Sequence, residues 1–127
     1  MDQATLVSPD ITAGAQALAA LDAAGLKHIV ALLAVFPEYE DWRFVVSSPS
    51  LNQTQQLRAY EQVTEALQGR FTYTLPTIMV LPTRDSFIRE LRNIFGKAKD
   101  VTGMRLGGQR IGNRFLSNAY VYRISPV

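Results

Sequence analysis

Residues 29–48, IVALLAVFPEYEDWRFVVSS, decide the fold that we predict for this chain. Residues 29–36 are apolar at every position, which is typical of a central strand covered on both faces. The polar segment 37–41 has the composition of a turn. Residues 42–48 then alternate, with Trp42, Phe44 and Val46 on one face. The stretch therefore predicts a β-hairpin.

A helix is expected before this hairpin. Ser8 suits the N-cap, Pro9 the first helical position and Asp10 the positive end of the helix dipole. Alanines fill much of the segment, and Gly25 is typical of a helix end. Gly14 marks the point where we expect the helix to approach a neighbouring element most closely.

A second helix is expected after the hairpin, over about residues 53–68. Pro49 stops the preceding strand, Asn52 and Gln55 have the spacing of a capping box, and Gly69 is typical of a helix end. The predicted buried stripe contains Leu57, Tyr60, Val63 and Leu67.

Residues 77–81, flanked by two prolines, predict a short interior strand. A helix leads into it and another leads out, which favours a parallel neighbour. Thr83 is the expected cap of a third helix over about residues 84–95, and Gly96 is its expected end. Its apolar stripe contains Phe87, Ile88, Leu91, Ile94 and Phe95.

The C-terminal segment predicts two further strands. Residues 104–106 form a short one, 107–113 a glycine-bearing loop, and 115–124 a long alternating strand. The order is therefore α-β-β-α-β-α-β-β. We predict one α+β domain over residues 1–127, with a single mixed sheet of about five strands and three helices. Residues 29–36 should be central, and 115–124 could be an edge open to pairing with a second copy.

Composition excludes several classes of protein. The 127 residues are 47% hydrophobic and 19% charged, which is unlike a disordered chain. The absence of cysteine excludes disulfides, thiol catalysis and cysteine zinc sites, and the single histidine excludes a multi-histidine metal site. No signal peptide is visible, and the longest apolar run is too short to span a bilayer. We therefore expect a soluble, cytoplasmic protein without a cofactor or a membrane partner.

The net charge of +2 conceals an uneven distribution. Residues 1–68 contain three Lys or Arg and eight Asp or Glu, a net charge of −5. Residues 69–127 contain ten Lys or Arg and three Asp or Glu, a net charge of +7. Such a split suggests an anionic partner. The alternative is that the two halves face each other, within one chain or across a homodimer.

Candidates for metal or acid–base chemistry are few. Glu38, Glu40 and Asp41 in the hairpin turn could hold a hard cation, but the calcium-loop pattern is absent and acidic turns are normally solvated. His28 is the one side chain suited to general base catalysis near neutral pH. No nucleophile or carboxylate partner for it is evident, and a structural role is favoured.

Two further patterns resemble catalytic or phosphate-binding motifs only in part. Ser47 and Ser48 follow a strand but lack the Gly-x-Ser-x-Gly elbow, so they are interpreted as strand-end hydroxyls. A glycine cluster could cradle phosphate, but its spacing matches no phosphate loop, and glycines in turns or bulges are the favoured interpretation. These glycines are Gly103, Gly107, Gly108 and Gly112.

Arginines and aromatic residues gather toward the C-terminus. Arginine binds phosphate bidentately and aromatic rings stack on bases, although both are also common in protein interfaces. The predicted binding residues are Arg84, Arg89, Arg92, Arg105, Arg110, Arg114, Tyr120 and Tyr122, with Arg123, Tyr73 and Phe115 nearby in sequence. No helix-turn-helix, zinc-finger or RNP-type motif is visible.

Two short stretches resemble an uncharacterised family of small bacterial proteins. They are Asp41-Trp42-Arg43 running into Ser48-Pro49, and the ending 118–123, NAYVYR. The resemblance implies an intact bacterial domain and carries no assigned activity. Asn118 stands where that pattern has an acidic residue.

These observations favour a small non-enzymatic binding protein whose basic C-terminal half engages an anionic partner, either nucleic acid or an acidic protein. A protein-interaction or self-assembling homodimeric module is the first alternative. An enzyme without metal or thiol chemistry is the second.

Overall fold

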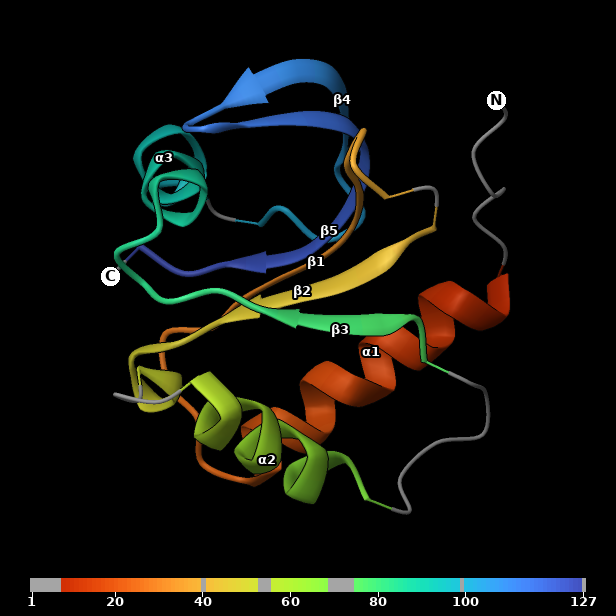
Figure 1. The fold of residues 1–127 in the computed structure, drawn as a ribbon, viewed down its shortest axis with the longest axis vertical. Coiled ribbons are helices and arrows are strands. Elements are labelled where there is room, and N and C mark those ends of the chain that lie inside the picture. The colour runs from red at the N-terminus through yellow and green to blue at the C-terminus, as the bar shows by residue number, and fades with distance from the viewer. Residues whose placement is uncertain (1–7, 40, 53–55, 69–74, 99, 127) are drawn as a thin grey trace.

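The computed structural model describes residues 8–39, 41–52, 56–68, 75–98 and 100–126 (Figure 1). The helices and strands follow the predicted order, and the α+β class with one mixed sheet and three helices is confirmed. The elements are α1 (Ser8–Ala23), β1 (Val30–Val35), β2 (Arg43–Ser47), the 3₁₀ turn η1 (Pro49–Leu51), α2 (Gln56–Leu67), β3 (Thr77–Val80), α3 (Ser86–Phe95), β4 (Arg105–Ile111) and β5 (Arg114–Ile124).

The five strands lie in the order β3-β2-β1-β5-β4. The central position of β1 is confirmed, as is the hairpin that it forms with β2. β2 and β3 are parallel, as expected from the helices on either side of β3, and every other neighbouring pair is antiparallel.

Two predicted strand positions are wrong. Residues 77–81 contain β3, which is an edge strand and not an interior one. The C-terminal strand β5 is interior, between β1 and β4, and is therefore not an open edge. The physical reason is β4: its seven residues cover the far side of β5, where the sequence predicted only a three-residue strand.

Helices cover both faces of the sheet. Figure 1 shows α1 and α2 on one side and α3 on the other. On the α1 and α2 side, Leu33 and Phe44 pack with Val63 in one apolar cluster. On the α3 side, Leu32 and Phe87 belong to a second cluster. Successive side chains of β1 therefore point into two separate cores, which explains why the strand is apolar throughout.

The close approach expected at Gly14 is confirmed. A Cβ atom at this position would overlap the ring of Tyr122 from β5. The Tyr122 hydroxyl donates a hydrogen bond to the Ile11 carbonyl, 2.7 Å away. Burial raises the pKa of the Tyr122 phenol far above its ordinary value, with smaller contributions from Tyr120 and Asp10. The ring therefore stays neutral and joins α1 to the sheet.

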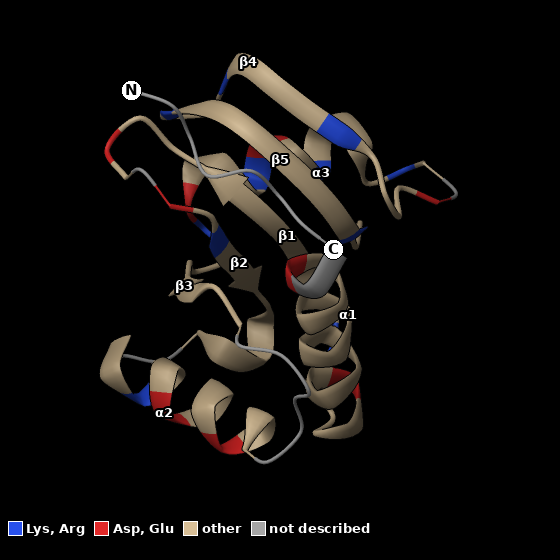
Figure 2. Cartoon of the chain, turned by 90° about the vertical axis from the view of Figure 1, so that its right-hand side faces the viewer, with Lys and Arg blue, Asp and Glu red and all other residues tan. Residues whose placement is uncertain are grey.

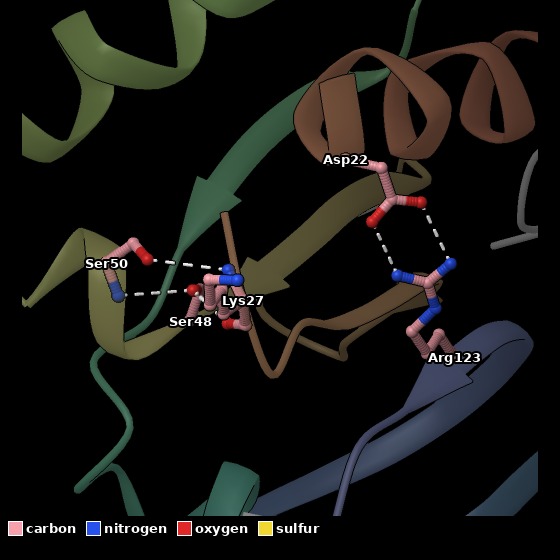
Figure 3. A network of polar contacts seen from close by, with 5 residues as sticks. All are labelled: Asp22, Lys27, Ser48, Ser50 and Arg123. Carbon is pink, nitrogen blue, oxygen red and sulfur yellow. Dashed lines mark hydrogen bonds and ion pairs between the residues drawn. The ribbon is translucent and has the colours of Figure 1, made fainter. Parts of the chain in front are cut away.

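Polar contacts join α1 to β5 and the loop after α1 to the segment after β2 (Figure 3). Asp22 at the end of α1 forms a bidentate ion pair with Arg123 of β5, at 2.7 and 2.9 Å. Ser48 donates its hydroxyl proton to the Lys27 carbonyl and accepts the Ser50 amide at 3.2 Å. Ser48 is thereby the N-cap of η1.

The helix boundaries and stripes differ in detail from the prediction. Asp85, and not Thr83, caps α3, because its carboxylate accepts the Phe87 amide at 2.9 Å. Leu57 was predicted to be buried but is 69% exposed, and Ala59 takes the buried position on α2. Ile94 is 53% exposed, whereas the next residue, Phe95, is partly buried against the α3-side cluster. The predicted Gln55 box and Gly69 end lie outside the described residues.

The segment 107–113 was predicted to be a loop but belongs mostly to β4. Its glycines explain the error, since glycine is uncommon inside strands. The interpretation of these glycines as positions of positive φ is confirmed for three of them. Gly103, Gly108 and Gly112 have φ values of 82°, 66° and 60°. Gly112 also lies so close to the Ser86 backbone that a Cβ atom would overlap it.

Within the described residues, no helix has both the length and the apolar character needed to cross a bilayer.

Candidate anion-binding site

The parallel pair β2 and β3 brings two connections together. Because β2 and β3 are parallel, their carboxyl ends lie side by side at the same end of the sheet. From there α2 follows β2 on one face, and α3 follows β3 on the other. In open α/β sheets this arrangement leaves a crevice outside the carboxyl ends of the strands. Asn52, after η1, bridges it to Thr83, before α3. Its amide donates to Oγ1 of Thr83 at 2.6 Å, and its carbonyl oxygen accepts the Thr83 amide at 3.0 Å.

Three of the predicted arginines meet in one depression on the α3 side of this crevice. It has a volume of about 450 Å³, and it is lined by Thr83, Arg84, Arg89, Arg92, Asn93 and Pro126. Arg89, Arg92 and Asn93 share a face of α3 because they are three and four residues apart. The lining contains no carboxylate among the residues that the structure describes. We call this depression the arginine pocket.

Arg92 is the fixed member of the arginine pocket. Its Nη2 donates to the His28 carbonyl at 2.7 Å, and its Nε is buried without a hydrogen-bond partner in the described residues. Partial burial lowers the pKa of Arg92 from its ordinary value. The group that holds it, His28, has a left-handed backbone with φ of 52°, which is uncommon outside glycine.

Arg84 and Arg89 complete the arginine pocket as exposed side chains. Neither forms an ion pair or a side-chain hydrogen bond with any part of the chain that the structure describes. Guanidinium groups in this state offer their full set of donors to an anion.

The other predicted arginines are placed elsewhere. Arg114 forms an ion pair with Asp85 at 3.5 Å. Arg105 donates to the Ala119 carbonyl and to Asn118 Oδ1, each at 3.1 Å. Arg110 is exposed on the edge strand β4, and its side chain forms no hydrogen bond or ion pair within the described ranges.

The predicted aromatic residues do not join the arginine pocket. Tyr122 is 6% exposed and lies under α1. Tyr120 contacts Tyr122 edge-on with ring centroids 5.2 Å apart, and both rings pack with the α1 and α2 core. Their role in the fold is therefore packing on the face opposite α3. Tyr73 lies outside the described residues.

A second depression shares Arg84 with the arginine pocket, and no sequence motif indicates it directly. It has a volume of about 280 Å³ and is lined by Leu51, Asn52, Gln56, Ala59, Val80, Pro82 and Arg84. Its members come from η1, α2, β3 and the loop before α3. The signal that points to this position is the predicted parallel strand pair, because the crevice rule follows from topology. We call it the β3 crevice.

The remaining candidates for chemistry are isolated. Glu38 and Asp41 are exposed, Glu40 lies outside the described residues, and the described part of the chain contains no cluster of three metal-binding side chains. The His28 imidazole is exposed and has neither a hydrogen bond nor an ion pair within that part. Ser48 caps η1, and the buried Oγ of Ser47 has no hydrogen-bond partner among the described residues.

The uneven charge of the sequence carries over into space. Figure 2 shows acidic residues along α1 and α2 at one end of the view and basic residues on β4 and β5 at the other. The Asp22–Arg123 pair joins the acidic helix α1 to the basic strand β5. The arginine pocket lies on the α3 side of the sheet, opposite the acidic helices.

The sequence matches no protein-family model, no curated protein and no solved structure at the significance required of a match.

Proposed function

We propose that this chain is a non-enzymatic binding protein that engages nucleic acid through phosphate contacts in the arginine pocket. The observation that carries the proposal is that Arg84, Arg89 and Arg92 line one depression, in which no other described residue contributes a carboxylate. Three like charges held together repel one another, and an anion relieves that repulsion. Arginine matches phosphate geometry with paired donors.

Further features support this proposal. Thr83 and Asn93 add neutral polar groups to the arginine pocket, and such groups commonly contact phosphate oxygens in nucleic-acid complexes. Exposed Arg110 on β4 extends the basic character beyond α3. The acidic helices lie on the other face, which favours approach of a polyanion from the α3 side.

Binding to a fluorescent single-stranded oligonucleotide, measured by anisotropy over a range of salt concentrations, tests the proposal. Three neutralised phosphates give a slope of log affinity against log salt of about −2 on a single strand. The paired substitution R84Q/R89Q should weaken binding about tenfold or more, and it should reduce the magnitude of the slope by about 0.7 for each arginine removed. Affinity that is independent of salt would contradict the proposal.

The matched control is R58Q. Arg58 is an exposed arginine on α2 and lies beside Glu61 and Glu65. The substitution changes the net charge by the same amount per site but should leave oligonucleotide binding unchanged. Equal losses for R58Q and for a single substitution in the arginine pocket would show that only total charge matters. Polyglutamate that competes as well as the oligonucleotide would overturn the assignment to nucleic acid.

A further inference from the structure

The arginine pocket and the β3 crevice share a wall. Arg84 lines both of them. The Asn52–Thr83 hydrogen bonds connect a residue that lines the crevice to one that lines the pocket, at 2.6 and 3.0 Å. The two depressions are therefore neighbouring parts of one surface feature at the carboxyl ends of β2 and β3. Together they reach the size of sites that hold small organic ligands, which is about 300–1,000 Å³.

The β3 crevice differs chemically from the arginine pocket. Its inner surface is apolar, because Leu51, Ala59 and Val80 are buried residues of the α1 and α2 core. Its polar members are the side-chain amides of Asn52 and Gln56 and the guanidinium of Arg84, all on exposed residues. A few polar groups around an apolar surface are typical of sites for flat, largely apolar ligands with polar edges.

The polar groups of the crevice are also held in position. Gln56 Nε2 donates to the Val80 carbonyl at 3.3 Å, which leaves its carbonyl oxygen and one N–H for another partner. Asn52 is oriented by its two bonds with Thr83. Side-chain amides offer adjacent donors and acceptors, as nucleobase edges do.

We propose that the two depressions form one site for a nucleotide, with its base in the β3 crevice and its 5′-phosphate in the arginine pocket. This inference rests on the proposed function and identifies the unit of nucleic acid that the site takes. Arg84 lines both the base site and the phosphate site, so that both the base and the phosphate of one nucleotide would contact it. The same chemistry is presented by a free nucleotide and by the 5′-phosphorylated end of a strand.

Calorimetric titration with the four ribonucleoside 5′-monophosphates, and with ribose 5-phosphate as the probe without a base, tests the inference. At least one nucleotide should bind about tenfold more tightly than ribose 5-phosphate, since a base that packs against the apolar residues of the crevice removes apolar surface from water. Equal affinity for the nucleotides and ribose 5-phosphate in the unmodified protein would overturn the inference. That result would leave the proposed function standing, provided that ribose 5-phosphate binding still depends on Arg84 and Arg89.

A matched pair of variants on α2 locates the base site. Q56W places a bulky ring at the crevice and should reduce nucleotide affinity to that of ribose 5-phosphate, while ribose 5-phosphate binding stays unchanged. L57W introduces the same ring one residue away, at an exposed position outside the crevice lining, and should bind as the unmodified protein does. Equal effects of the two substitutions on nucleotide affinity would contradict the placement of the base.

Oligonucleotides with and without a 5′-phosphate distinguish the two sources of the ligand. Tighter binding of the phosphorylated strand supports recognition of strand ends, whereas tighter binding of the free nucleotide than of either strand supports a mononucleotide ligand. If the unmodified protein binds neither nucleotides nor oligonucleotides, and R84Q/R89Q behaves in the same way, the proposed function itself is wrong.

Discussion

Ser47 and Ser48 are adjacent in sequence and completely buried, yet their hydroxyl groups have opposite surroundings. Ser47 Oγ has no hydrogen-bond partner among the described residues, whereas Ser48 Oγ bonds to the Lys27 carbonyl and the Ser50 amide. A buried hydroxyl without a partner is destabilising, and a buried hydroxyl with two partners stabilises the fold. The contribution of a buried serine to stability therefore depends on its hydrogen-bond partners as well as on its burial.

We predict opposite effects when each serine is replaced by alanine. S48A should lower the free energy of unfolding by about 1–3 kcal/mol, because the Lys27 carbonyl and the start of η1 lose their partner. S47A should leave it unchanged or raise it by up to about 1 kcal/mol. Urea denaturation of both variants measures the difference. A larger loss for S47A than for S48A would show that the Ser47 hydroxyl is satisfied in solution.

The sequence identified the residue types of the candidate site but not their partners. All three arginines of the arginine pocket were among the predicted binding residues. Arg105 and Arg114 lie elsewhere because Arg105 bonds to Ala119, 14 positions along the chain, and Arg114 pairs with Asp85, 29 positions before it. Such pairings follow from tertiary structure, which local composition does not encode. The amides of Asn52 and Gln56 in the β3 crevice were missed because a single polar residue has no periodic signal.

At the scale of an element, Asp85 connects the start of α3 to β5. Its Oδ1 accepts the Phe87 amide, and its Oδ2 lies 3.5 Å from Arg114. One carboxylate thereby caps a helix and neutralises a partly buried arginine.

Substitutions of Asp85 separate these two roles. D85A removes both and should destabilise the protein by about 1–2 kcal/mol. D85N retains a good capping residue and loses only the charge, so its effect should be clearly smaller. Thermal denaturation of both variants provides the measurement. Equal destabilisation by the two would indicate that the ion pair with Arg114, and not the cap, is the dominant contribution.

Elements with a strong periodic pattern were predicted well, and elements that depend on glycine were not. The hairpin of β1 and β2 was predicted from the apolar run of β1 and the alternation of β2, because both sequence patterns reflect which side chains are buried. In β4, Gly107 and Gly108 obscured a strand of seven residues. That strand determines that β5 is interior, so one local error displaced the predicted edge of the sheet.

At the scale of the whole molecule, both edges of the sheet carry features that hinder pairing with another sheet. β3 has four residues and lies between Pro76 and Pro82. β4 carries the charged residues Arg105 and Arg110, and Gly108 with its positive φ interrupts the regular ladder. Short strands, prolines, charges and irregular backbone all discourage edge-to-edge association.

We therefore expect the protein to remain monomeric. Sedimentation velocity at two protein concentrations about tenfold apart should give one species of 14.1 kDa. A sedimentation coefficient that rises with concentration would contradict this expectation and would favour the self-assembling module that the sequence left as an alternative.

The middle of the sheet also constrains how the chain is made. β1 pairs on one side with residues that directly follow it and on the other with residues near the opposite terminus, since Val30 lies against Ile124. During translation the second neighbour, β5, emerges only after β2, β3 and β4. Until then one side of the apolar strand β1 lacks its hydrogen-bonding neighbour. Contacts between residues so far apart in sequence also form slowly. The nascent polypeptide should consequently depend on ribosome-associated chaperones more than its modest size suggests.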